Sequence, residues 1–235
     1  MTSRELGNIL ITGGASGLGA ATVKAVRRHG GTPLVIDVNP LPGEFGEDIA
    51  FAQCDLADTG AVDAAVRDLA ERVDGRLHGV FTAAGTDACG KLGDVPVKDW
   101  ERVIHVNLLG TAAVVRSALP YLKTTHGRIV TVASTLGIKA VSDATAYCAS
   151  KFGVIGFTRA LAAELAGEVG VTTLIPGGMH TAFFDNRDEQ YKPPPDAKLN
   201  QPENVAETVV FALTQPVGCE VRELVVCAPT ESSWP

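Results

Sequence analysis

The sequence predicts an α/β protein built on a doubly wound parallel sheet of about seven strands, with helices on both faces. Apolar runs of strand length alternate along the chain with longer stretches of helical period. Such alternation is typical of a parallel sheet whose right-handed crossovers place helices on both sides. No composition break, linker or internal repeat divides the 235 residues, so we expect a single domain spanning residues 1–235.

Each expected strand is a short run of apolar or β-branched residues. These runs lie at 8–12, 32–38, 49–54, 77–83, 128–133, 171–175 and 223–227. The expected helices lie at 17–29, 59–73, 97–123, 146–168 and 202–213. Asp58 or Thr59 caps the second of these helices, and the third breaks once near residues 105–107.

Residues 186–201 have the composition of a loop, and Pro193, Pro194 and Pro195 follow one another there. A loop this long inside a compact domain usually acts as a lid or binds substrate. We therefore expect a substrate loop at about residues 179–201.

The composition argues against several classes of partner. A formal net charge of −7 disfavours nucleic acid and anionic membranes. No window approaches the roughly 18 unbroken apolar residues of a membrane span, and no signal segment follows Met1. The protein is therefore expected to be cytoplasmic.

The five cysteines and five histidines are scattered, without a CxxC pair or ligand spacing. We expect no disulfide framework and no metal site. Cys148 is expected to pack as a small apolar side chain, because no base is placed to activate it. His180 stays open between a plain loop histidine and a residue that faces substrate.

A glycine-rich turn follows the first expected strand and leads directly into a helix. Its residues are Thr12, Gly13, Gly14, Ala15, Ser16, Gly17, Leu18 and Gly19. Such a turn, typical of Rossmann-type folds, brings the backbone close to a pyrophosphate at the helix N-terminus, where a Cβ would block the approach. The spacing is G-x3-G-x-G rather than G-x-G-x-x-G, and a turn that only packs helix against strand is the alternative.

Two acidic residues end expected strands. Asp37 follows the second strand, where a carboxylate meets ribose hydroxyls and would repel a 2′-phosphate. This favours NAD over NADP, unless Asp37 only caps a loop. Asp55 and Leu56 end the third strand and would border the adenine, unless Asp55 is only a turn residue.

Tyr147 and Lys151 lie at positions i and i+4 of one expected helix and so share a face. A nearby ammonium lowers the pKa of a tyrosine, which then serves as a general acid–base. The spacing alone is common on surface helices. Ser134, however, ends the preceding strand at the sheet edge where such folds bind ligands.

These motifs resemble those of the short-chain dehydrogenase/reductase family, in its compact branch. The glycine turn matches T-G-x3-G-x-G, and Tyr147 to Lys151 matches Y-x-x-x-K with Ser134 as the serine upstream. Asn107 is similar to the family's asparagine motif, and the Pro176 segment to its loop after the sixth strand. The matches follow the expected order and cover most of the chain.

The resemblance implies reversible hydride transfer between NAD(P), with NAD preferred, and a secondary alcohol or ketone. It implies that Tyr147 exchanges a proton with the substrate oxygen, which Ser134 also hydrogen-bonds, and that Lys151 lowers the tyrosine pKa and holds the nicotinamide ribose. Asn107 would bind a water that links Lys151 to solvent, and Thr181 would bind the nicotinamide carboxamide. The other implied cofactor contacts are Gly13, Ala15, Ser16, Gly17, Leu18, Gly19, Ala84, Gly85, Pro176, Gly177 and Met179.

The sequence departs from the family pattern in two places. Thr82-Ala83-Ala84-Gly85 stands where the family carries N-N-A-G, which puts some sheet-stabilising hydrogen bonds in doubt. The C-terminal residues also differ from those of many 3-oxoacyl-(acyl carrier protein) reductases.

Several readings stay open beside the oxidoreductase. That acyl reductase activity is one alternative, and a catalytically silent NAD(P)-sensing regulator on the same fold is another. A sugar-nucleotide epimerase or dehydratase would need more residues after Thr181. The substrate itself is not defined. Residues 86–89, 135–138 and 179–198 are expected to shape its pocket, and Leu136, Phe183 and Phe184 indicate an apolar component. The family resemblance also implies a homodimer or homotetramer.

Overall fold

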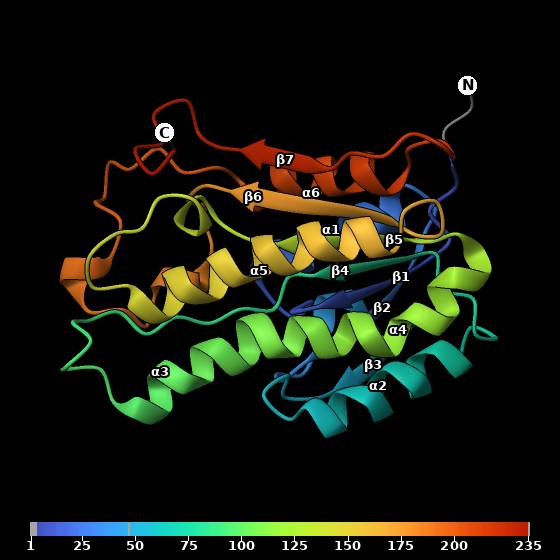
Figure 1. Cartoon of the computed structure of the whole chain (residues 1–235), viewed down its shortest axis with the longest axis horizontal. Helices are drawn as coiled ribbons and strands as arrows, with labels where there is room; N and C mark the ends of the chain where they lie inside the picture. Colours follow the sequence, from blue (N-terminus) through green and yellow to red (C-terminus); the bar gives the residue numbers. More distant parts are fainter. Residues whose placement is uncertain (1–3, 47, 235) are drawn as a thin grey trace.

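The computed structural model describes residues 4–46 and 48–234 (Figure 1). Seven parallel strands form one sheet in the order β3-β2-β1-β4-β5-β6-β7. They are β1 (Asn8–Thr12), β2 (Thr32–Asp37), β3 (Ala50–Gln53), β4 (Gly79–Thr82), β5 (Arg128–Val132), β6 (Gly170–Pro176) and β7 (Glu223–Val226). This confirms the predicted doubly wound sheet, whose strand ends differ from the expected ones by a few residues.

Six α-helices accompany the strands in the described part of the chain. They are α1 (Gly17–Arg28), α2 (Thr59–Glu71), α3 (Val97–Ile104), α4 (Thr111–Thr125), α5 (Thr145–Glu164) and α6 (Pro202–Leu213). Shorter helical turns are η1 (Gly43–Phe45), η2 (His105–Gly110), η3 (Thr135–Gly137), η4 (Ala182–Phe184) and η5 (Glu189–Tyr191). The last two lie within the expected substrate loop.

Successive side chains along each strand point to opposite faces of the sheet, and a layer of helices packs against each face. Ile9 and Ile11 of β1 pack into a core with α1 and α6, whereas Leu10 between them packs into a second core with α2, α4 and α5. Both faces of the sheet are therefore covered (Figure 1). This double burial explains why the strands are continuous apolar runs rather than alternating ones.

The order of the strands reverses beside β1. In this central strand Thr12 pairs with Ile36 of β2 on one side and with Thr82 of β4 on the other. The loops after β1 and β4 therefore leave in different directions and open a crevice at the carboxyl ends of the strands, where doubly wound folds bind ligands. This edge of the sheet holds the expected site.

The helix at 97–125 does not break near residues 105–107. Instead α3 continues into α4 through the π-helical turn η2, which accommodates an extra residue within the helix. By length and composition this is the one helix of the described residues that could cross a membrane, with a mean hydropathy of 1.3. Val114, Val115 and Leu122 on it are buried in the core beside α2, which accounts for the apolar composition.

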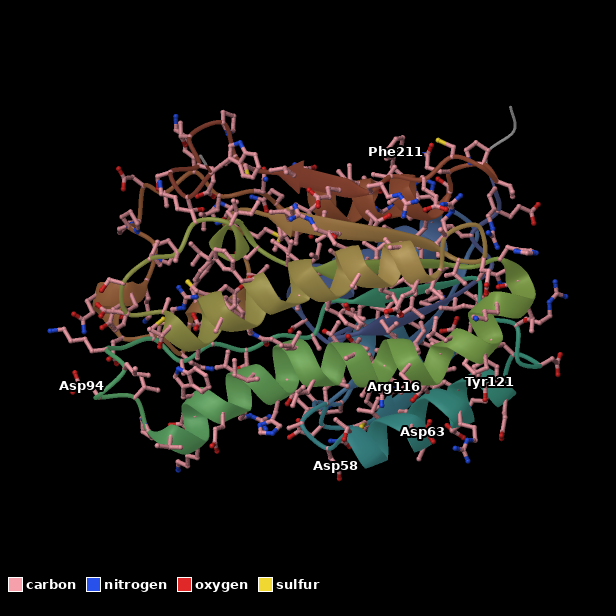
Figure 2. All side chains as sticks on the ribbon, viewed as in Figure 1. Asp58, Asp63, Asp94, Arg116, Tyr121 and Phe211 are labelled. Atoms are coloured by element: carbon pink, nitrogen blue, oxygen red, sulfur yellow. The ribbon has the colours of Figure 1, made fainter. Side chains whose placement is uncertain are left out.

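The start of α2 provides a test of local stability. The Asp58 carboxylate accepts hydrogen bonds from the backbone N–H groups of Gly60 and Ala61, at 3.1 and 3.0 Å, and so caps the helix (Figure 2). We predict that Asp58→Ala lowers the free energy of unfolding by about 1 kcal/mol, whereas Asp58→Asn, which retains a capping oxygen, stays close to the unmodified protein. Urea denaturation measures both variants, and equal losses would contradict the capping role.

Candidate active site

The glycine turn after β1 is shaped by contacts that leave no room for side chains. A Cβ added to Gly19 would lie 2.0 Å from the carbonyl oxygen of Gly13. A Cβ on Gly13, whose φ is +72°, would lie 2.7 Å from the backbone nitrogen of Ala84. The start of α1 is thus pressed against β1 and the end of β4, as a pyrophosphate cradle requires.

The N-terminus of α1 has free hydrogen-bonding capacity. Ser16 occupies the N-cap position but makes no side-chain capping bond, and the first turn has no acidic residue. The first backbone N–H groups of a helix have no partner within it and attract anions. The turn from Gly13 to Gly19, with Ala15 and Leu18, therefore suits a phosphate-bearing cofactor.

Asp37 lies at the end of β2 beside this turn and is 8% exposed. One of its oxygens accepts a hydrogen bond from Ala15 N at 2.9 Å, and the other accepts one from Asn39 N at 2.9 Å. The carboxylate thus fixes the turn as well as ending the strand. Its remaining lone pairs can accept hydroxyl groups.

The second expected adenine contact has protein partners of its own. Asp55 accepts hydrogen bonds from Ala57 N at 3.0 Å and from Arg102 at 2.9 Å. The Ala57 and Arg102 contacts outweigh burial and lower the pKa of this carboxyl. Leu56 beside it is buried against Gly110 of η2. Asp55 thus acts as the turn residue that was the alternative reading, and its predicted contact with a cofactor stays a prediction.

The expected catalytic side chains come together at the ends of β4 and β5. Lys151 is 4% exposed, and its ammonium donates to Val132 O at 2.8 Å and lies 5.6 Å from the centre of the Tyr147 ring. Ser134 lies next to the Tyr147 side chain, and its hydroxyl accepts a hydrogen bond from Leu136 N at 3.1 Å. Tyr147 and Lys151 from α5 and Ser134 from the segment after β5 thus lie together.

Asn107, from the π-helical turn, is fully engaged beside this group. Its Oδ1 accepts from Thr86 N at 2.8 Å, and its Nδ2 donates to Thr86 O at 2.9 Å and to Ser150 Oγ at 3.0 Å. A Cβ on Gly85 would lie 3.4 Å from this amide and 3.8 Å from the Lys151 nitrogen. The Asn107 side chain therefore ties the loop after β4 to α5, and its predicted part in a water relay is not tested.

The surroundings shift the two key titrating groups in opposite directions. Burial, reinforced by the charge of Asp87, raises the pKa of Tyr147 above its usual value, and this outweighs the opposing influences of Ser134 and of the Arg187 charge. Burial also lowers the pKa of Lys151 to about 8. The net shift of the Tyr147 pKa is upward in this arrangement, and the lowering expected from Lys151 stays a prediction.

The loop after β6 is held from three sides. Gly177 N donates to Val226 O of β7 at 3.0 Å, and Asn200 N donates to Gly178 O at 3.0 Å. The Glu231 carboxylate accepts from Gly178 N at 2.8 Å. Pro176, Gly177 and Met179 thus form a braced segment. It runs on to Thr181, whose side chain lies 3.4 Å from where a Cβ of Gly17 would be.

Two contacts at the site were not predicted. The C-terminal tail contributes Glu231 and also Ser233, whose hydroxyl lies 2.6 Å from that of Thr135 beside Ser134. An ion pair joins Asp87 to Arg187. Both residues of this pair lie within the ranges expected to shape the substrate pocket, but no sequence motif indicated that they pair or that the tail takes part.

The missing asparagines after β4 have a structural consequence. Thr12 Oγ1 accepts a hydrogen bond from Ala84 N at 3.2 Å, so one backbone group is satisfied from the neighbouring strand. The Thr82 hydroxyl is buried without a partner among the described residues. The unpaired hydroxyl is a local cost of this departure.

The remaining histidines and cysteines show no catalytic or metal-binding arrangement among the described residues. Within residues 4–46 and 48–234 no cluster of three or more metal-ligating side chains occurs. Cys148 is 6% exposed, in line with a packing role, whereas His180 is exposed and only its backbone is bonded, to Asn200.

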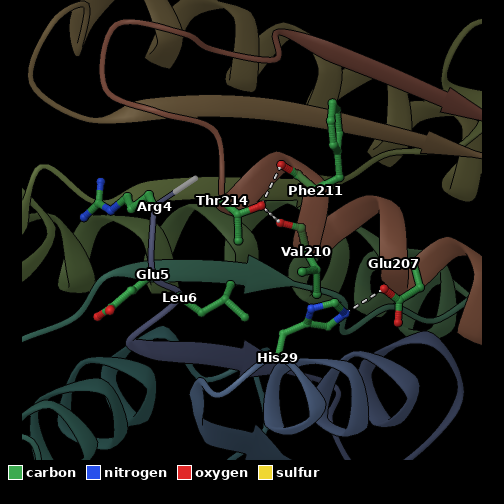
Figure 3. Close-up of a pocket in the computed structure, with 8 residues that line it drawn as sticks. All are labelled: Arg4, Glu5, Leu6, His29, Glu207, Val210, Phe211 and Thr214. Atoms are coloured by element: carbon green, nitrogen blue, oxygen red, sulfur yellow. Dashed lines mark hydrogen bonds and ion pairs between the residues drawn. The ribbon is translucent and has the colours of Figure 1, made fainter. Parts of the chain in front are cut away.

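Two cavities lie at opposite ends of the strands. One, of about 420 Å³ (Figure 3), is at the amino ends, away from all expected site residues, and is lined by Arg4, Glu5, Leu6, His29, Glu207, Val210, Phe211 and Thr214. The other, of about 440 Å³, lies beside the expected substrate loop, and its walls include Asp87, Cys89, Asp188 and Tyr191.

A sequence model of the short chain dehydrogenase family matches residues 7–192, which include the glycine turn, Ser134, Tyr147 and Lys151. The chain belongs to this family. The resemblance inferred from the motifs is thereby confirmed, and it spans most of the sheet.

Relatives of this short-chain dehydrogenase are similar over nearly their whole length. Short-chain dehydrogenase/reductase olcF from Penicillium canescens is 30% identical over 249 residues, covering 96% of this chain and 95% of that protein. The (2S)-[(R)-hydroxy(phenyl)methyl]succinyl-CoA dehydrogenase subunit BbsD of Thauera aromatica is 33% identical over 218 residues, covering 86% and 87%.

Solved structures share the fold at lower identity. Levodione reductase superimposes with a TM-score of 0.86 at 24% identity, covering 98% of this chain and 100% of that one. An alcohol dehydrogenase from Thermococcus sibiricus, complexed with 5-hydroxy-NADP, gives 0.84 at 23% identity, covering 94% and 96%. As a member of the short chain dehydrogenase family, the protein is an oxidoreductase of a family that uses NAD(P).

The close packing of the glycine turn predicts that adding one methyl group at Gly19 lowers both stability and cofactor binding. In Gly19→Ala the added carbon meets backbone that cannot move aside. We expect the free energy of unfolding to fall by about 1–3 kcal/mol and nicotinamide dinucleotide binding to weaken strongly. Denaturation and titration calorimetry measure the two effects. Gly43→Ala is the control, because no atom lies within 4 Å of the added carbon; unchanged binding by Gly19→Ala would contradict the cradle.

Proposed function

We propose that the protein catalyses reversible hydride transfer between a nicotinamide cofactor and a secondary alcohol or ketone, with Tyr147 as the general acid–base. The observation that carries this proposal is the convergence of the Tyr147, Ser134 and Lys151 side chains at the carboxyl edge of the sheet. The glycine turn and the loop after β6 lie at the same carboxyl edge of the sheet, where doubly wound folds bind dinucleotides.

The residues that would hold the cofactor follow the crevice from one side to the other. The glycine turn and the α1 N-terminus suit the pyrophosphate, and Asp37 suits the adenosine ribose hydroxyls. Lys151 would hold the second ribose, and Thr181 with the braced backbone after Pro176 would hold the carboxamide. When bound, the nicotinamide supplies or accepts the hydride; the protein's groups handle the proton and the orientation.

The side chains present divide the proton chemistry between them. Because burial keeps the Tyr147 hydroxyl protonated through neutral pH, it can donate a proton to a carbonyl oxygen as that oxygen gains negative charge. Ser134 can donate a hydrogen bond to the same oxygen and stabilise its developing charge. Oxidation of an alcohol requires the deprotonated tyrosine, so that direction is favoured as pH rises.

NAD is the proposed cofactor in preference to NADP. Asp37 is buried next to the turn, and its carboxylate would meet a 2′-phosphate with like charge. The turn itself contains no lysine or arginine to offset that repulsion. The Thermococcus alcohol dehydrogenase complexed with an NADP derivative shows that NADP use is compatible with this fold, so Asp37 rather than the fold carries the preference.

A turnover screen with Tyr147→Phe tests the chemistry. With a panel of ketones and alcohols, we expect the unmodified protein to oxidise or reduce the cofactor, and Tyr147→Phe to lose turnover by on the order of a thousandfold. Cofactor affinity should be largely retained. Tyr121→Phe, near the C-terminal end of α4 (Figure 2), is the matched control and should retain activity. Cofactor binding with no turnover on any substrate would instead favour the regulatory sensor.

The cofactor preference has its own test. In Asp37→Asn the repelling charge is removed while one amide oxygen can still accept from Ala15 N. We expect kcat/KM with NADPH to rise and that with NADH to fall, so that the ratio moves toward NADP by about tenfold or more. Parallel assays with the two cofactors measure the ratio, and an unchanged ratio would show that Asp37 only shapes the turn.

A further inference from the structure

An ion pair between two largely shielded side chains connects two loops near the proposed acid–base. Arg187 Nη2 lies 2.5 Å from Asp87 Oδ2, and the two side chains are 18% and 6% exposed. In every other ion pair of the described residues at least one side chain is 46% exposed or more. Asp87–Arg187 is therefore the one pair whose partners are both shielded from water in this part of the chain.

The arginine sits on an aromatic layer that reaches Tyr147. The ring of Phe183 lies 5.8 Å from the ring of Tyr147, centre to centre. The guanidinium carbon of Arg187 lies 5.2 Å above Phe183 and 4.7 Å above Phe184. Arg187 Nη1 also donates to Tyr191 O at 3.3 Å. The segment 182–191 is thus stacked over Tyr147 through its aromatic side chains and fastened at Arg187.

The aspartate is fixed by the opposite loop. Asp87 Oδ1 accepts from Ala88 N at 2.7 Å, and Oδ2 accepts from the Cys89 thiol at 3.3 Å as well as from Arg187. This loop is itself tied to α5 by the contacts between Asn107 and Thr86. The carboxylate therefore occupies a defined place relative to the catalytic centre.

The charged and titratable groups that face Tyr147 are few. They are Lys151 from the same helix, Asp87 from the loop after β4, Arg187 from the segment 182–191, and the neighbouring Cys148. Asp87 raises the pKa of Tyr147 and Arg187 lowers it, so the two members of the pair oppose each other there. Asp87 also raises the pKa of Lys151.

We propose that Asp87 and Arg187 are positioning residues for the reaction: their ion pair fastens the segment 182–191 beside Tyr147 and holds two opposite charges against the aromatic side chains that contact it. The inference rests on the proposed function for its second half, because only an acid–base Tyr147 converts the balance of these two charges into a pH profile. The first half concerns the fold alone and is tested without turnover.

Hydrogen exchange tests the fastening. Asp87→Asn and Arg187→Gln each leave the other charge buried and unpaired, so we expect amide exchange in 182–191 to accelerate by about tenfold or more in both. Exchange in β1 and α1, remote from the pair, should stay unchanged and shows that the variants are folded. Unchanged exchange in 182–191 overturns the proposal, whether or not any substrate has been found.

The pH dependence of alcohol oxidation tests the balance between the Asp87 and Arg187 charges beside Tyr147. The kcat/KM for this direction rises with pH as Tyr147 loses its proton. Asp87→Asn is expected to move that rise to lower pH and Arg187→Gln to move it to higher pH, each by on the order of one unit. The double variant should fall between them. A merely structural loosening would move both single variants the same way, and that result overturns the balance.

Glu189→Gln is the matched control. This side chain lies in the same segment, is 89% exposed and pairs with Lys192, so its loss removes one carboxylate without touching the buried pair. Neither exchange in 182–191 nor the pH profile should change. If the unmodified protein showed no turnover with any substrate, the proposed function would fail. The exchange rates would still show whether the ion pair holds the segment 182–191 in place.

Discussion

The close approach of the first helix to the first strand is the constraint on which the rest of the site depends. With no side chain at Gly13 or Gly19, the start of α1 lies directly on β1 and beside the end of β4. Its unpaired N–H groups then point along the crevice where the strand order reverses. Bulk at either glycine would push the helix away, and Asp37 and the loop after β6 would no longer face the same space.

Around this crevice several buried polar groups have protein partners, whereas the Thr82 hydroxyl and Arg187 Nε have none among the described residues. The Lys151 ammonium donates a hydrogen bond to the carbonyl of Val132 in β5. The Asn107 amide donates to Thr86 O and to Ser150 Oγ. Asp87 and Arg187 neutralise one another in the same interior. Buried groups without such partners are costly, so each contact both stabilises the fold and sets where a reacting oxygen can be placed.

The fold and the motif residues could be predicted from the sequence because both depend on local order. Strand runs, helical periods and the glycine turn are short patterns, and the structure places them as expected. The site residues Ser134, Tyr147 and Lys151 come together because Ser134 directly follows β5 and α5, which carries the other two, starts only a few residues later. The π-helical turn could not be predicted from the sequence, because the polar residues at 105–107 suggested a break in the helix. In the structure Asn107 is buried and hydrogen-bonded, and the helix continues through a wider turn.

The parts that escaped prediction depend on distance through the chain. Asp87 and Arg187 are 100 positions apart, and Glu231 reaches Gly178 from 53 positions away. No spacing rule links such residues. The i, i+4 spacing of Tyr147 and Lys151 can be found in the sequence, but the pKa shifts of the two groups cannot. Those shifts depend mainly on burial in the folded protein, where the Lys151 ammonium donates to Val132 O.

The role of the tail has a consequence for the order in which the protein is made. Strands β1 to β6 and their helices leave the ribosome before Glu231 and Ser233, which are among the last residues of the sequence. A growing chain can therefore build its sheet and cores while the loop after β6 still lacks its third support. The loop after β6 gains the support of Glu231 only after the sheet has left the ribosome, so a nascent chain can be largely folded before this edge of the sheet is fully braced.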